Sequence, residues 1–164
     1  MAQLRNEGYT INHKTVYRLM KEEGLKNVRR RSKYRSYRGE VGKTAPNILN
    51  RDFGTTGPNQ KWTTDVTQIN IGADKCFLSP ILDMYNGEIV SYAISDRPDL
   101  KMVMEMLDRA YAAREVKAGL MLHSDQGWQY QHYSYQRSLR DHDIVQSMSR
   151  KGNCLDNAMM ENFF

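Results

Sequence analysis

Cysteine and long hydrophobic runs are scarce in this 164-residue chain, and each absence excludes a class of protein. The two cysteines, Cys76 and Cys154, stand far apart and form no CxxC pair, so neither a zinc module nor a disulfide framework is expected. No stretch approaches the roughly 18 consecutive apolar residues that a membrane span needs. The first residues, MAQLRNEGYT, lack the hydrophobic segment of a signal peptide. We therefore expect a cytoplasmic protein without a membrane partner.

Positive charge is concentrated in the first third of the sequence. Residues 1–61 hold 14 Lys and Arg against 5 Asp and Glu, whereas residues 62–164 hold 10 against 14. A hydrophobic content of 40% is enough for a folded core. This difference in charge predicts that residues 1–61, the front of the chain, bind a polyanion. It also suggests that the carboxylates of residues 62–164 serve something other than solubility.

Residues 1–25 read as two short helices around a turn. The segment 1–8 ends at a glycine, and the segment 11–25 has Asn12 as an N-cap and Gly24 as a C-cap. Two helices around a glycine-containing turn are compatible with a helix-turn-helix that binds DNA. A small helical hairpin of another function has the same pattern, so this alternative stays open.

A basic linker is expected over residues 26–54. Its first part contains no acidic residue before Glu40, and Tyr34 and Tyr37 are interleaved with the cations. The cations can neutralise phosphates while the aromatic rings stack on bases, which favours nucleic-acid binding over an inert spacer. The segment 41–47, VGKTAPN, lacks the leading glycine of a phosphate-binding loop. The candidate DNA-binding residues are Lys26, Arg29, Arg30, Arg31, Lys33, Arg35 and Arg38.

From residue 55 onward the pattern predicts an α/β domain that runs to residue 164. β-branched and aromatic residues predict three strands, and Asn86-Gly87 between the second and third is typical of a hairpin turn. An amphipathic helix follows, with Met102 or Val103, Met106, Leu107 and Ala110 on its inner face, and after it two further strands and two helices. This order gives a mixed five-stranded sheet flanked by helices. The predicted strands are 62–71, 76–85, 88–95, 119–124 and 144–149, and the predicted helices are 100–116, 131–142 and 156–164.

Three carboxylates can meet at one point of this sheet. Asp65 lies within the first strand, where aspartate is disfavoured, and Asp125 ends the fourth strand. The first strand is central in such a sheet and the fourth commonly pairs beside it, while the last helix can bring Glu161. Converging carboxylates repel one another unless divalent cations neutralise them, and oxygen ligands suit Mg²⁺ or Mn²⁺. Singly, each residue could equally hold a turn, cap a bulge or face solvent.

The segments PNQKWTTDVT, LHSDQGWQY and SMSRKGNCLDNAMMENFF resemble the catalytic core of DDE transposases from bacterial insertion sequences, the branch related to retroviral integrases. The segment GYTINHKTVYRLMKEEGL is similar to the helix-turn-helix region that precedes this core. The resemblance implies a ribonuclease-H-like fold in which Asp65, Asp125 and Glu161 bind two Mg²⁺ or Mn²⁺ ions. It also implies DNA strand cleavage and strand transfer at terminal inverted repeats and target DNA, by a homo-multimer associated with the bacterial nucleoid.

The same resemblance implies supporting roles for residues near Asp65, Asp125 and Glu161. Arg150 and Lys151 are expected to touch DNA, and Gln126 and Asn157 are expected to orient the metal ligands. His123 is interpreted as a packing residue, because metal-bound water needs no histidine base. Trp62 is likewise interpreted as a core aromatic.

Family cores continue beyond the point where this chain stops, so the resemblance leads us to expect a core truncated at its C-terminus. A short terminal helix holds its ligand poorly, and we therefore expect weak or no strand transfer by the chain alone. Two other functions stay open. One is a ribonuclease-H-type nuclease that uses the same carboxylate chemistry, and the other is a non-catalytic DNA-binding remnant.

Overall fold

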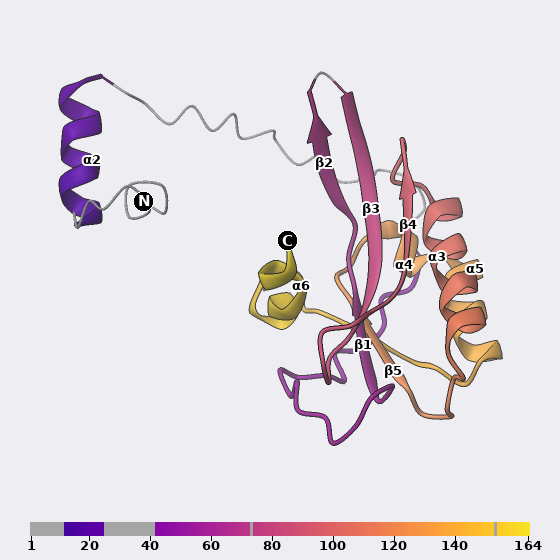
Figure 1. Ribbon diagram of the computed structural model, residues 1–164. Helices are drawn as coiled ribbons and strands as arrows, with labels where there is room; N and C mark the ends of the chain where they lie inside the picture. Colours follow the sequence, from indigo (N-terminus) through magenta and orange to yellow (C-terminus); the bar gives the residue numbers. More distant parts are fainter. Residues whose placement is uncertain (1–11, 25–41, 73, 153) are drawn as a thin grey trace. The chain divides into compact units, whose positions relative to one another are not determined.

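The computed structural model describes residues 12–24, 42–72, 74–152 and 154–164 (Figure 1). The chain divides into two compact units, Met1–Ser36 and Tyr37–Phe164. Two expectations, the helix over residues 1–8 and the seven basic residues of 26–38, lie outside the described residues. Among the described residues, no helix is long and apolar enough to cross a membrane.

The first unit contains helix α2, His13–Glu22, whose N-cap is Asn12 as predicted and whose C-cap is Glu23, one residue before the predicted Gly24. The Asn12 side chain accepts a hydrogen bond from the Lys14 backbone N–H at 2.9 Å. Gly24 has a φ of +67°, and its N–H donates to the Lys21 carbonyl at 3.2 Å. This backbone conformation costs glycine little and explains why the helix ends there.

The second unit is built on a six-stranded mixed sheet. Strand β3 pairs antiparallel with β4 on one side and with β1 and β2 on the other, and β1–β5 and β5–β6 are parallel pairs. The predicted hairpin at Asn86-Gly87 joins β3 and β4, and Gly87 has a φ of +71°. The strands are β1 Lys61–Thr64, β2 Thr67–Ile71, β3 Asp74–Asp83, β4 Ile89–Ser95, β5 Met121–Ser124 and β6 Val145–Met148.

The prediction of one continuous strand over residues 62–71 was wrong. The structure divides it into β1 and β2, so the expected five strands become six. The register with β3 continues unchanged across the break, because Thr64 pairs with Ile81 and Thr67 with Leu78. At the break, the Asp65 carboxylate accepts the Val66 N–H at 2.7 Å. Asp65 therefore stands at an interruption between two strands and not within one.

Helices cover both faces of the sheet in Figure 1, with α3, α4 and α5 on one side and α6 on the other. The short α4 was not predicted, and the last predicted helix begins with a 3₁₀ turn, η1. Helices α3 and α5 lie within the predicted ranges. The elements are α3 Leu100–Ala113, α4 Trp128–Gln131, α5 Tyr133–Asp141, η1 Cys154–Asn157 and α6 Ala158–Phe163.

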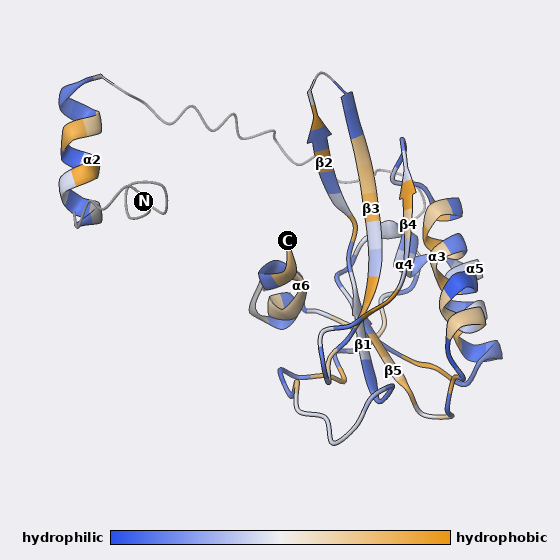
Figure 2. Ribbon diagram, in the orientation of Figure 1, coloured by the Kyte–Doolittle hydropathy of each residue, from blue (hydrophilic) through white to orange (hydrophobic). Residues whose placement is uncertain are grey.

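The core lies between the sheet and α3. The inner face of α3 is buried as predicted, and it packs with the buried side chains of Trp62, Ile81 and Leu122. The packing interpretation of Trp62 is therefore confirmed. Figure 2 shows the contrast along β3, whose tip is hydrophilic while its middle is hydrophobic. The buried residues of α3 are Met102, Val103, Met106, Leu107 and Ala110.

Residues 43–51, which we call the strap, run along β6 and are bonded to it. The Ser147 hydroxyl of β6 accepts the backbone N–H groups of Ile48 and Leu49, each at 3.0 Å. In return, the Met148 N–H donates to the Pro46 carbonyl at 3.2 Å. The strap falls within the predicted linker 26–54, yet it is part of the second compact unit.

Candidate active site

Asp65 and Asp125 stand opposite each other where two neighbouring parallel strands end. Strand β1 pairs with β5 so that Trp62 is level with Leu122 and Thr63 with His123. Continuing this register by two residues brings Asp65 level with Asp125. Because the strands are parallel, both carboxylates emerge at the same edge of the sheet. The fold thus brings together two of the three predicted ligands.

The electrostatics of Asp65 reflect this closeness. Burial, and after it the negative charge of Asp125, raises the pKa of Asp65 from 3.8 to about 7. The charge of Glu161 acts in the same direction, whereas hydrogen bonds from the Val66 N–H and the Asn157 side chain oppose the shift. A carboxyl with such a pKa faces other negative charge in a poorly solvated place.

Asp125 is held by the loop that follows β5. Its Oδ1 accepts the Gly127 N–H at 2.7 Å. Burial raises the pKa of Asp125, and the bond from Gly127 opposes this shift. A Cβ on Gly127 would lie 2.9 Å from Asp125 Oδ1, so only glycine lets the backbone approach the carboxylate this closely.

The last helix brings Asn157 and Glu161 toward the same place. The buried Asn157 donates from Nδ2 to Asp65 Oδ2 at 3.3 Å. Glu161 lies in the first turn of α6, is exposed to solvent, and is close enough to raise the pKa of Asp65. The predicted ligands therefore occupy one neighbourhood, with two of them half-buried and the third on an exposed helix face.

The donor chemistry of this neighbourhood fits a hard divalent cation. Among the described residues, no Lys, Arg or His forms an ion pair with Asp65, Asp125 or Glu161. The buried Asn157 Oδ1 likewise has no hydrogen-bond partner in the described part of the chain. Carboxylate and amide oxygen atoms are the ligands that Mg²⁺ and Mn²⁺ prefer. No three His, Cys, Asp or Glu side chains of the described ranges form a closed ligand set, however.

Gln126 and Arg150 were assigned roles next to the metal ligands, but their side-chain hydrogen bonds go to other residues. The Gln126 side chain donates to the Ser149 carbonyl at 3.0 Å, and so it braces β5 against the loop after β6. Arg150 binds the Asp156 carboxylate through Nε and Nη2, each at 2.9 Å. Lys151 is exposed. The DNA contacts assigned to Arg150 and Lys151 stay predictions.

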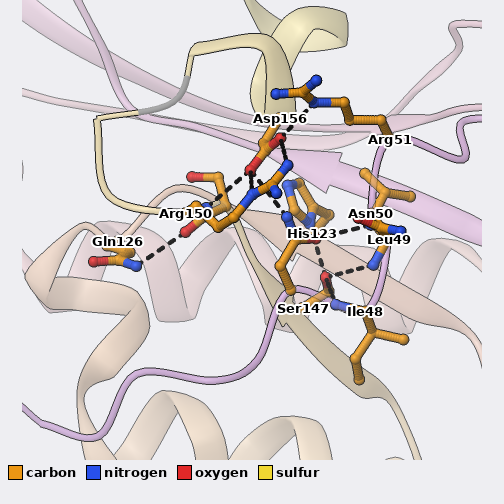
Figure 3. Close-up of polar contacts among 11 residues, drawn as sticks. Ile48, Leu49, Asn50, Arg51, His123, Gln126, Ser147, Arg150 and Asp156 are labelled. Atoms are coloured by element: carbon orange, nitrogen blue, oxygen red, sulfur yellow. Dashed lines mark hydrogen bonds and ion pairs between the residues drawn. The ribbon is translucent and has the colours of Figure 1, made fainter.

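Sequence reasoning missed Asp156, a fully buried carboxylate one residue before Asn157. Figure 3 shows it surrounded by polar groups of the strap and of the loop after β6. The sequence offered one signal for a buried ion pair, because Arg150 lies only six positions before Asp156. The other partners, Asn47 and Arg51, are distant in sequence. Hydrogen bonds to the Arg150 side chain hold the pKa of Asp156 well below its usual range.

His123 is a packing residue, as interpreted from the sequence. It is completely buried, and its Nδ1 lies 2.9 Å from the Ser147 hydroxyl. That hydroxyl already accepts two strap N–H groups, so its own proton goes to His123 Nδ1. Burial lowers the pKa of His123, and the Asp156 backbone and charge oppose the shift only in part.

This fold and this pair of carboxylates define a class of protein, and comparison with known proteins identifies that class. The integrase core domain model matches residues 55–154, and an HTH-like domain model matches residues 1–33. The chain belongs to the integrase core domain family, in the group of insertion-sequence transposases.

Curated bacterial relatives match nearly the whole chain. It is 54% identical over 161 residues to the InsK protein of insertion sequence element IS150 from Escherichia coli strain K12, covering 98% of this chain and 57% of the relative. It is 51% identical to an uncharacterized transposase-like protein of Haemophilus influenzae, covering 96% and 73%. It is 33% identical to transposase InsF for insertion sequence IS3A of Escherichia coli strain K12, covering 99% and 57%. The chain thus spans little more than half the length of InsK and InsF.

Solved structures agree on the fold. The HTLV-2 integrase catalytic core domain in complex with magnesium has a TM-score of 0.52 at 18% identity, with 65% of each chain covered. A chain of the simian T-cell lymphotropic virus intasome in complex with PP2A regulatory subunit B56 gamma has a TM-score of 0.59 at 18% identity, over 74% of this chain and 40% of that one. The ribonuclease-H-like fold expected from the sequence is therefore confirmed.

Proposed function

We propose that this chain carries the catalytic centre of an insertion-sequence transposase, with Asp65, Asp125 and Glu161 as ligands of Mg²⁺ or Mn²⁺. The observation that supports this most strongly is the Asp65–Asp125 pair, whose members directly follow β1 and β5, lie level with each other and have no cationic partner among the described residues. Such a pair costs stability unless a cation is bound, so a catalytic role explains it better than a structural one.

The residues of the chain have separate tasks in this proposal. Asp65 and Asp125 hold two ions from the rigid edge of the sheet, and Glu161 closes the ligand set from α6. Asn157 orients Asp65 through its hydrogen bond, and Gly127 fixes Asp125 through its N–H. When bound, two such ions activate an attacking oxygen and stabilise the leaving oxygen of a phosphodiester.

DNA is the proposed partner of the front of the chain. The HTH-like match over residues 1–33 and the run of basic residues from Lys26 to Arg38 favour contacts with phosphates. Arg150 and Lys151 are proposed contacts near the catalytic centre. The substrates in this proposal are terminal inverted repeats and target DNA of the bacterial nucleoid, joined by a multimer of the chain.

The test is cleavage of labelled duplexes that carry the terminal repeats flanking the gene. We expect Mn²⁺-dependent nicking at the repeat end by the wild-type chain, and its loss in Asp65→Asn and Asp125→Asn. Asp141→Asn, on the exposed side of α5, is the matched control and should nick like the wild type. Preferential cutting of an RNA–DNA hybrid would replace the proposal with a ribonuclease-H-type activity. DNA binding without metal-dependent cleavage would replace it with a binding function.

A further inference from the structure

Asp156 is the buried carboxylate with the most polar partners in the described part of the chain, and it precedes the helix that carries Glu161. Its Oδ1 accepts from Arg51 Nε at 3.0 Å and Arg150 Nη2 at 2.9 Å. Its Oδ2 accepts from Arg150 Nε at 2.9 Å, Asn47 Nδ2 at 2.9 Å and the Arg150 backbone N–H at 3.1 Å. Figure 3 shows both guanidinium groups directed at this one carboxylate.

A fully buried charge is tolerated only when it is paired and its oxygen atoms are hydrogen-bonded. Asp156 meets both conditions, with five donors for its two oxygens. Its guanidinium partners are about half exposed, at 45% for Arg51 and 53% for Arg150. The arrangement therefore fixes η1 in place and leaves the outer parts of the two arginines at the surface.

The donors come from parts of the chain that are themselves held by β6. Asn47 and Arg51 belong to the strap, which the Ser147 hydroxyl holds through two backbone N–H groups. Arg150 is the second residue after β6, and the Ser149 N–H between them donates to the Ser124 carbonyl at 2.8 Å. The hydrogen bonds that Asp156 accepts from Asn47, Arg51 and Arg150 thus connect η1 to the strand pair β5–β6. This connection lies beside the end of β5 that Asp125 follows.

Helix α6 has little stability of its own. It spans six residues, Ala158–Phe163, and Met160 is its buried side chain. Isolated helices of that length are not stable in water, so its position depends on what fixes its start. Asn157, the residue after Asp156, occupies the N-cap position of this helix, and its side chain donates to Asp65 and not to the first turn of α6.

We propose that Asp156 is a positioning residue: clamped by Arg51, Arg150 and Asn47, it fixes the start of α6 so that Asn157 and Glu161 face Asp65 and Asp125. This inference rests on the proposed function, because it assigns Glu161 to the metal ligands. It also gives Arg150 a structural task in addition to its predicted DNA contact.

The test compares the wild type with Asp156→Asn, which keeps the shape of the side chain and removes its charge. Amide hydrogen exchange should become faster in peptides covering η1 and α6, while α3 keeps its protection. The Mn²⁺ concentration for half-maximal binding, measured from the electron paramagnetic resonance of free Mn²⁺, should rise about tenfold or more. Asp52→Asn is the matched control, because it removes the exposed ion pair of Asp52 with Lys61 beside the strap and should change neither measurement.

Arg51→Gln is the second variant, in case Asp156→Asn does not fold. It removes one half-exposed donor and should produce the same changes in smaller size. Unchanged exchange in α6, or faster exchange with unchanged Mn²⁺ binding, overturns the positioning role. Failure of the proposed function is recognised separately, because the wild type would then bind Mn²⁺ no better than Asp65→Asn.

Discussion

Replacing Asp65 by Asn should stabilise the metal-free protein at neutral and alkaline pH. Burial and the charge of Asp125 raise the pKa of Asp65 to about 7 in the folded chain, from 3.8. The folded state therefore binds a proton at Asp65 more tightly than the unfolded state. Proton binding at Asp65 therefore stabilises the folded state at low pH. As the pH rises from about 4 to about 7, this stabilisation is lost, and above about 7 the loss is complete.

The size of the effect follows from the difference between the two pKa values. At 1.36 kcal/mol per pKa unit, the rise from 3.8 to about 7 corresponds to at most about 4 kcal/mol. Asp65 is only half-buried, so water and small movements reduce this figure. We expect Asp65→Asn to be more stable than the wild type by about 1–2 kcal/mol at pH 8, and equally stable near pH 4.

Urea denaturation in the presence of EDTA at a series of pH values measures this difference. The wild type should lose stability relative to Asp65→Asn between pH 4 and pH 7, and Asp141→Asn should follow the wild type. Added Mg²⁺ should then stabilise the wild type and leave Asp65→Asn unchanged. Parallel curves for the wild type and Asp65→Asn, or a less stable variant at pH 8, would refute the reasoning.

Three further substitutions test other parts of the structure. Gly127→Ala brings a methyl group to 2.9 Å from Asp125 Oδ1, so the Mn²⁺ concentration for half-maximal binding should rise about tenfold while the urea midpoint barely changes. Ser147→Ala leaves His123 Nδ1 and two strap N–H groups without their partner, which should cost about 1–3 kcal/mol in urea denaturation and speed proteolysis within the strap. Leu107→Ala removes a fully buried side chain under the sheet and should cost about 2–5 kcal/mol, whereas unchanged stability would contradict its place in the core.

Regular, local patterns made much of the fold predictable. The helical spacing of apolar residues in α3 identified its buried face, and Asn12, Gly24 and the Asn86-Gly87 turn marked their elements correctly. Each of these signals acts within a few residues of its own position, so a single sequence carries it. The mixed sheet followed from the order of such elements.

The features that sequence reasoning missed depend on side chains distant in the chain. Aspartate is disfavoured in strands, but this preference alone did not show that Asp65 would bond the N–H of Val66 and separate β1 from β2. The burial of Asp156 depends on Asn47 and Arg51, more than 100 positions away, and no local pattern reports such a contact. The carboxylates of the candidate site were chosen by family resemblance, and the β1–β5 register then supplied the physical reason for pairing Asp65 with Asp125.

The central claim is that the acidic side chains at the ends of β1 and β5 form a binding site for divalent cations. Titration of the chain with Mn²⁺, followed by the resonance of the free ion, tests it most directly. We predict saturable binding by the wild type, its loss in Asp65→Asn and Asp125→Asn, and a weaker but measurable affinity in Glu161→Gln. Equal Mn²⁺ binding by all four proteins would contradict the claim.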